Sequence, residues 1–236
     1  MRKRFTLAIA FVALASLGLA AMRSHASDHR DGTATTTDPA TDIADVYAFM
    51  RPLDADGGAP ETGAPEAGPY AKSDHLVLVM TVFPSATGSA TFDPRGEFLF
   101  NVAAAAPDVR AGDVDPTIDV LVACRFQPAA SSNGTQPFIC SVNGFFFAGN
   151  TDELAGADSA PLRVFAGRRA DPAFGAANAA MAAVASGSLP DASNAADDFS
   201  NDNVLAIVAE IDVDRVVFGD AGRRPLAVSA TVGRFQ

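Results

Sequence analysis

The run HLVLVMTVF, His75 to Phe83, decides the fold class of this chain. It is almost continuously apolar and rich in branched side chains, which predicts a central strand covered on both faces. Other short apolar runs are separated by turn-forming residues, and βα alternation is absent. We therefore predict a mainly β fold, an antiparallel β-sandwich of about eight strands. The expected strands are Asp45–Met50, His75–Phe83, Gly96–Val102, Asp119–Phe126, Phe138–Phe147, Leu162–Phe165, Asn203–Ile211 and Leu226–Phe235.

One helix is expected between the strands, over residues 171–187. Asp171 can cap its start, Pro172 suits its first turn and Gly187 can end it. The run between them is rich in alanine and has a few larger apolar side chains that could pack on a sheet. The arginines Arg168 and Arg169 precede this helix. They could attract an anion to its N-terminus, but an ion pair between Arg169 and Asp171 is the simpler expectation.

The N-terminus has the pattern of a secretory signal peptide, residues 1–26. A basic start is followed by the apolar stretch Phe5 to Met22 and by Ser24-His25-Ala26, which offers small residues where a signal peptidase cuts. An earlier cut after Ala20 is a second option. We predict an exported protein, periplasmic or extracellular, with no membrane span after cleavage.

The remaining residues, 27–236, are expected to form a single domain. An extended arm (27–41) precedes the first strand, and a flexible surface loop rich in Gly and Pro spans residues 51–73. The whole chain has a net charge of -11, and removing the signal peptide would leave 13 basic against 28 acidic residues, a net charge of -15. So acidic a surface argues against nucleic acid as a partner.

The two cysteines, Cys124 and Cys140, are expected to form a structural disulfide. An exported chain favours oxidised cysteines, and both lie in β-type runs. The segment between them is rich in Pro, Ser and Asn and includes the turn signal Asn133-Gly134. The bond should therefore close a β-hairpin.

Several motifs resemble a bacterial exported family catalogued as domain of unknown function 4331. The arm Ser27-Asp-His-Arg-Asp-Gly32 is similar to that family's SSHREAP start, and Asp42 to Phe49 (DIADVYAF) is similar to its DVYAF segment. Phe165 to Phe174 (FAGRRADPAF) and Asn203 to Glu210 (NVLAIVAE) match two further segments, although alanine replaces an acidic residue and an aromatic residue in the first of these. The resemblance implies a β-rich exported module and no established reaction.

The arm offers two alternatives for its own role. If cleavage follows Ala26, the free amine, two amide nitrogens and the imidazole of Ser27-Asp28-His29 could bind Cu(II) or Ni(II) in a square plane. His75 and Asp31 could add ligands. Alternatively, His29 and Arg30 dock the arm on the sandwich, pairing with Asp42 or Asp45.

Acidic loops provide weaker candidates for other chemistry. Three groups could bind a hard cation such as Ca²⁺: Asp54 with Asp56, Asp197 with Asp198 and Asp202, and Asp212 with Asp214. The first of these lacks the later glutamate of an EF-hand. A hydrolase that uses paired carboxylates is a third function class. No catalytic residue is assigned. The leading prediction is a non-catalytic exported module with a binding or structural role and an unknown partner.

Overall fold

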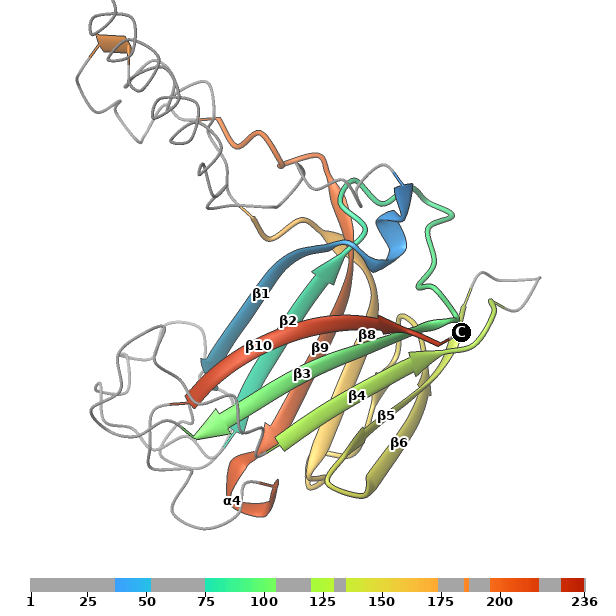
Figure 1. Ribbon diagram of the computed structural model, residues 1–236, viewed down its shortest axis with the longest axis vertical. Coiled ribbons are helices and arrows are strands. Elements are labelled where there is room, and N and C mark those ends of the chain that lie inside the picture. Colours follow the sequence, from blue (N-terminus) through green and yellow to red (C-terminus); the bar gives the residue numbers. More distant parts are fainter. Residues whose placement is uncertain are drawn as a thin grey trace, which may run out of the picture.

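The structure, a computed structural model shown in Figure 1, describes residues 37–51, 75–104, 120–129, 135–173, 185–186, 196–216 and 226–235. Its strands form two five-stranded sheets that pack face to face. Sheet A has the order β1 (Ile43–Met50), β2 (His75–Val82), β9 (Asn203–Asp212), β8 (Leu162–Ala170) and β7 (Leu154–Ala155). Sheet B has the order β10 (Leu226–Arg234), β3 (Gly96–Ala104), β4 (Val120–Phe126), β5 (Pro137–Val142) and β6 (Phe145–Asn150).

The strand pairs are antiparallel throughout the described sheets, so the predicted antiparallel sandwich is confirmed. The run that decided the fold class forms β2, in the interior of sheet A between β1 and β9. Leu78 and Met80 of β2 are buried against sheet B, and Val77 and Thr81 on the opposite face are also buried. A strand covered on both faces explains why its sequence is almost continuously apolar.

The predicted strand Phe138–Phe147 is wrong as a single element. It is a hairpin, β5 and β6, with the turn Asn143-Gly144, and both turn residues have positive φ (45° and 86°). Positive φ at both central residues defines a type I′ turn, which matches the twist of the flanking strands and favours Asn-Gly. The short strand β7 is also absent from the prediction.

The core lies between the sheets. Sheet B contributes alternate residues of β3 and β4, among them Phe98 and Phe100 at zero exposure, while their neighbours in sequence point outward. Four phenylalanines pack together at one end of the core: Phe92, Phe98, Phe126 and Phe138. Phe92 stacks on Phe126 with ring centroids 4.0 Å apart, and Phe98 meets both rings edge to face. Such pairs add to the stabilisation from apolar burial.

The disulfide between Cys124 and Cys140 is present, as the sequence predicts. The two residues face each other directly in the β4–β5 pair, and their side chains are fully buried. Their Cα atoms lie 4.1 Å apart, close to the spacing of a non-hydrogen-bonded cross-strand pair. The bond therefore closes the β4–β5 hairpin, as expected.

Helical structure is sparse in the described part of the chain. It includes a 3₁₀ turn, η1 (Pro39–Thr41), within the arm that was expected to be extended, and one turn of α-helix, α4 (Val213–Val216). The predicted helix 171–187 lies mostly outside the described residues. At its start, the Asp171 Oδ1 accepts a hydrogen bond from the amide of Ala173, the contact that an N-cap residue makes. No described helix is long and apolar enough to cross a membrane.

Candidate functional site

The outer face of sheet B exposes large apolar side chains. Strand alternation turns Leu121 of β4, Ile139 of β5 and Phe146 of β6 away from the core, and they are 41%, 47% and 73% exposed. Phe235, directly after β10, is 47% exposed. The outward face of an antiparallel sheet usually carries polar residues. An apolar outer face is therefore a candidate interaction surface.

A groove of about 490 Å³ lies on this face. Cross-strand register builds it from two rows of side chains: Glu97, Arg125 and Ile139 form one row, and Ala123, Ser141 and Phe146 form the next. Phe126 and Gln127 complete the lining. Apolar walls with a few polar groups are typical of ligand-binding clefts.

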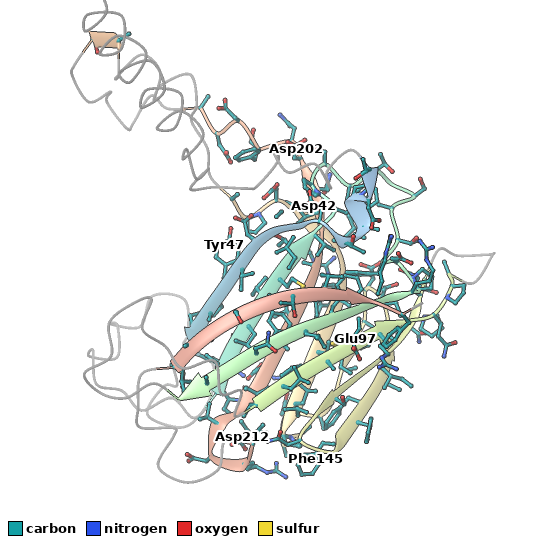
Figure 2. The ribbon with its side chains drawn as sticks, viewed as in Figure 1. Asp42, Tyr47, Glu97, Phe145, Asp202 and Asp212 are labelled. Atoms are coloured by element: carbon teal, nitrogen blue, oxygen red, sulfur yellow. A yellow bond between two sulfur atoms is a disulfide. The ribbon has the colours of Figure 1, made fainter. Side chains whose placement is uncertain are left out.

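The charged groups of the groove neutralise each other. Arg125 Nη2 lies 2.6 Å from Glu97 Oε1, and Arg125 Nε donates a hydrogen bond to the same oxygen at 2.8 Å. The guanidinium also lies over the Phe235 ring, 4.0 Å from its centroid. Figure 2 shows Glu97 on the sheet B side of the molecule. The groove thus presents a paired, neutral polar edge beside the apolar side chains of Ile139 and Phe146.

The strands beneath the groove are held rigidly. The disulfide joins β4 to β5 on the core side, directly behind the neighbours Ala123 and Ser141, which line the groove. At the end near Phe126, the buried Gln136 side chain donates to the carbonyls of Phe92 and Gln127 and accepts from the Phe92 amide. A floor fixed in this way loses little conformational freedom when a ligand binds.

Sheet A carries a different polar cluster, centred on Glu210 of β9. Arg51 Nη1 lies 2.7 Å from its carboxylate, His75 Nδ1 lies 2.9 Å away and Arg163 Nη1 lies 3.4 Å away. Arg163 also pairs with Asp158 at 2.9 Å. The Arg51 amide donates to the His75 carbonyl at 2.8 Å. This cluster ties the end of β1 to β2, β8 and β9. The sequence suggested His75 as an additional metal ligand, whereas in the structure its imidazole contacts Glu210.

The predicted docking carboxylates lie at one end of sheet A. Asp42 is buried and, as Figure 2 shows, lies at the same end of the sandwich as Asp202, opposite to Asp212. Burial of Tyr47, followed by the charges of Asp45 and Asp171 and a hydrogen bond to Asp45, raises the pKa of its phenol to about 12. Asp45 and Asp171 are therefore close enough to act on one hydroxyl.

The expected ion pair between Arg169 and Asp171 is replaced by another. Arg169 Nη1 lies 3.3 Å from Asp152 Oδ1, and its guanidinium lies over the Phe165 ring at 3.9 Å from the centroid. Arg169 and Phe165 are four residues apart on one face of β8, with only Gly167 between them on that face, so the long arginine side chain can lie over the ring. The arginine thus packs along sheet A instead of bonding to the cap residue Asp171.

The remaining sequence candidates for a metal site lie only partly within the described residues. Ser27, Asp28, His29, Arg30 and the acidic loop at residues 54–56 lie outside the described residues. Asp197 accepts hydrogen bonds within its own turn, from the Phe199 amide and the Ser200 hydroxyl. Asp212 accepts from the Arg215 amide. Within the described ranges, no group of three or more His, Cys, Asp or Glu side chains is arranged to hold a metal ion.

Sequence reasoning missed the groove, although one signal for it was present. The Asn143-Gly144 turn fixes which residues of β5 and β6 face one another, and hence places Phe146 beside Ser141.

Comparisons with protein-family models, with curated proteins and with solved structures found no match for this chain.

Proposed function

We propose that this chain is an exported, non-catalytic β-sandwich module that binds a ligand on the outer face of sheet B. The observation that carries the proposal is the groove flanked by Ile139 and Phe146, two apolar side chains left largely exposed on an otherwise acidic protein. Exposing such side chains to water is unfavourable, so an apolar patch on a stable fold is usually a binding surface.

The chemistry of the groove defines the class of ligand. Its large apolar side chains offer apolar contact, and its charged edge, Arg125 with Glu97, is already neutralised. An ionic ligand would have to compete with that pair. The groove therefore suits an uncharged ligand with an apolar side and a few hydrogen-bonding groups for Ser141 and Gln127.

Export is part of the proposal and rests on sequence. The signal-like N-terminus supports it, and the disulfide is compatible with an oxidising compartment. The resemblance to domain of unknown function 4331 points to the same compartment and adds no reaction.

A photo-crosslinking amino acid at position 141, inside the groove, tests the binding function in the secreting cells. The matched control carries the same amino acid at Glu153, an exposed position before β7 of sheet A. A product formed from position 141, absent from position 153 and reduced by Ile139→Ser supports the proposal. Equal labelling from both positions, or labelling that is insensitive to Ile139→Ser, contradicts it.

A further inference from the structure

The β6 strand is an edge strand of sheet B, and Figure 1 shows it as the outermost strand on that side. Its sequence, FFFAGN, begins with three phenylalanines, of which Phe145 and Phe146 are 44% and 73% exposed. Edge strands normally carry charges, proline or bulges that prevent them from pairing with another chain. The described β6 has no charged residue and no proline, and its pairing with β5 is regular.

The hairpin register determines which backbone groups face outward. A two-residue turn makes Val142 and Phe145 the first hydrogen-bonded pair, so Phe145 and Phe147 bond to β5. The N–H and C=O of Phe146 and Ala148 then point away from the sheet. The far end of β6 is partly covered by sheet A, since a Cβ added at Gly149 would lie 2.8 Å from that of Ala155. The half that is open for pairing is Phe145–Phe147.

We propose that this edge pairs with the same edge of a second copy of the chain, antiparallel and about a two-fold axis at Phe146. In that register the N–H and C=O of Phe146 bond to those of the second copy's Phe146, and Phe145 of each copy lies opposite Phe147 of the other. Each of these cross-strand pairs is aromatic, which is among the favourable side-chain pairings. The edge is thus complementary to itself, as a two-fold interface must be.

Charge favours this edge over the other surfaces as a self-association site. Two chains of net charge -11, or -15 once the signal peptide is removed, repel each other, and contact is easiest where neither copy presents a charge. The hairpin from Asn143 to Asn150 is such a stretch. The pairing would also form one continuous sheet with two grooves on the same outer face. The proposed dimer depends on the β6 edge alone, so it does not require the groove to bind a ligand.

Sedimentation equilibrium of the secreted protein over a wide concentration range tests the proposal. Wild type should show a monomer–dimer equilibrium that strengthens as added salt screens the repulsion. Phe146→Glu, which places like charges opposite each other at the two-fold axis, should weaken the dimer at least about tenfold. Leu154→Glu is the matched control, because Leu154 is a 56% exposed residue of β7 and the substitution adds the same charge. It should leave the dimer constant unchanged.

A cysteine at position 146 identifies the register. On a two-fold axis it should cross-link two copies under oxidising conditions, whereas a cysteine at position 154 should not. Circular dichroism and thermal melting establish that each variant is folded. A wild type that remains monomeric at all concentrations overturns the proposal, as does a dimer that Phe146→Glu and Leu154→Glu weaken equally. A monomer whose β6 edge binds an added peptide strand would assign the edge to a different partner and also overturn it.

Discussion

Cys124 and Cys140 lie directly opposite each other on β4 and β5, and their disulfide is on the core face of the strands whose outer face forms the groove floor. The neighbours Ala123 and Ser141 also face each other, on the groove side. One covalent bond therefore fixes the spacing of the two strands that any ligand on this surface would contact.

Removing the disulfide should lower stability without changing the fold. The double variant Cys124→Ser and Cys140→Ser should lose about 3 kcal/mol of unfolding free energy, because the unfolded chain is no longer constrained by the loop. Urea unfolding followed by circular dichroism measures the difference. Reductant should destabilise wild type by a similar amount and leave the double variant unaffected. A loss below about 1 kcal/mol would show that the hairpin is held chiefly by its strand pairing.

Glu210 should be the most sensitive charged residue of sheet A. Its side chain is 15% exposed and lies within 4 Å of Arg51, His75 and Arg163. Glu210→Gln would remove the counter-ion of the partly buried Arg51 and leave Arg163 with only the exposed Asp158, at a cost of about 3 kcal/mol in urea unfolding.

The matched control for Glu210 is Glu97→Gln, which breaks the pair with Arg125 on the exposed face of sheet B. Arg125 is more than half exposed, so solvent screens that pair and the loss should stay below about 1 kcal/mol. Equal losses in the two variants would contradict the assignment of Glu210 as the electrostatic centre of sheet A.

Asp93 should make a pH-dependent contribution to stability. Burial alone would raise its pKa, but hydrogen bonds from the Arg95 side chain and backbone and from Arg234 outweigh burial and lower the pKa. A lowered pKa in the folded state means that the contribution is present above about pH 4 and is lost as the pH falls through the folded pKa. Asp93→Asn should therefore cost about 2 kcal/mol at pH 7 in urea unfolding, and the difference from wild type should shrink towards pH 2. A difference independent of pH would show that the charge of Asp93 contributes nothing.

Tyr47 should lower the stability of the protein at high pH. Its pKa of about 12 in the folded state lies above the ordinary value of 10.0. The unfolded chain ionises first, so the contribution of Tyr47 is complete below pH 10 and is lost as the pH rises towards 12. Difference absorbance at 295 nm should show an ionisation near pH 12 that disappears in Tyr47→Phe. The same variant should remove part of the alkaline fall in unfolding free energy. If the ionisation that Tyr47→Phe removes lay near pH 10, it would contradict the interaction with Asp45 and Asp171.

The N-terminal metal hypothesis makes a prediction that depends on processing. Intact mass must first show that the secreted chain begins at Ser27; a start at Ala21 removes the site. With Ser27 first, the protein should bind one equivalent of Cu(II) with the visible absorption of a square-planar nitrogen site, and His29→Ala should abolish it. His75→Ala is the control, because the His75 imidazole contacts Glu210 in sheet A. Equal Cu(II) affinity in wild type and His29→Ala would leave His29 with a docking role only.

The sequence predicts elements well where local chemistry decides and poorly where register decides. The disulfide, β2 and the Asn143-Gly144 turn can each be recognised from neighbouring residues, although the turn was overlooked within the run Phe138–Phe147. The Glu210 cluster joins Arg51 to a residue 159 positions away, and that contact depends on the strand order of sheet A. The groove likewise requires Ala123, Ser141 and Phe146 to align across three strands, and period-two alternation alone does not show which phase of a strand faces the core.

Groove variants should separate binding from stability. Ile139→Ser and Phe146→Ser remove side chains that are already largely exposed, so each should change the unfolding free energy by no more than about 0.5 kcal/mol. The same variants should reduce the fluorescence of the apolar probe ANS with the folded protein, because the probe binds exposed apolar surface. Phe138→Ser, on the buried face of β5, is the contrasting control and should cost about 3 kcal/mol or more. If Ile139→Ser or Phe146→Ser destabilised the protein as much as Phe138→Ser, the side chains of Ile139 and Phe146 would be structural. That result would contradict the proposal that the outer face of sheet B is the binding surface.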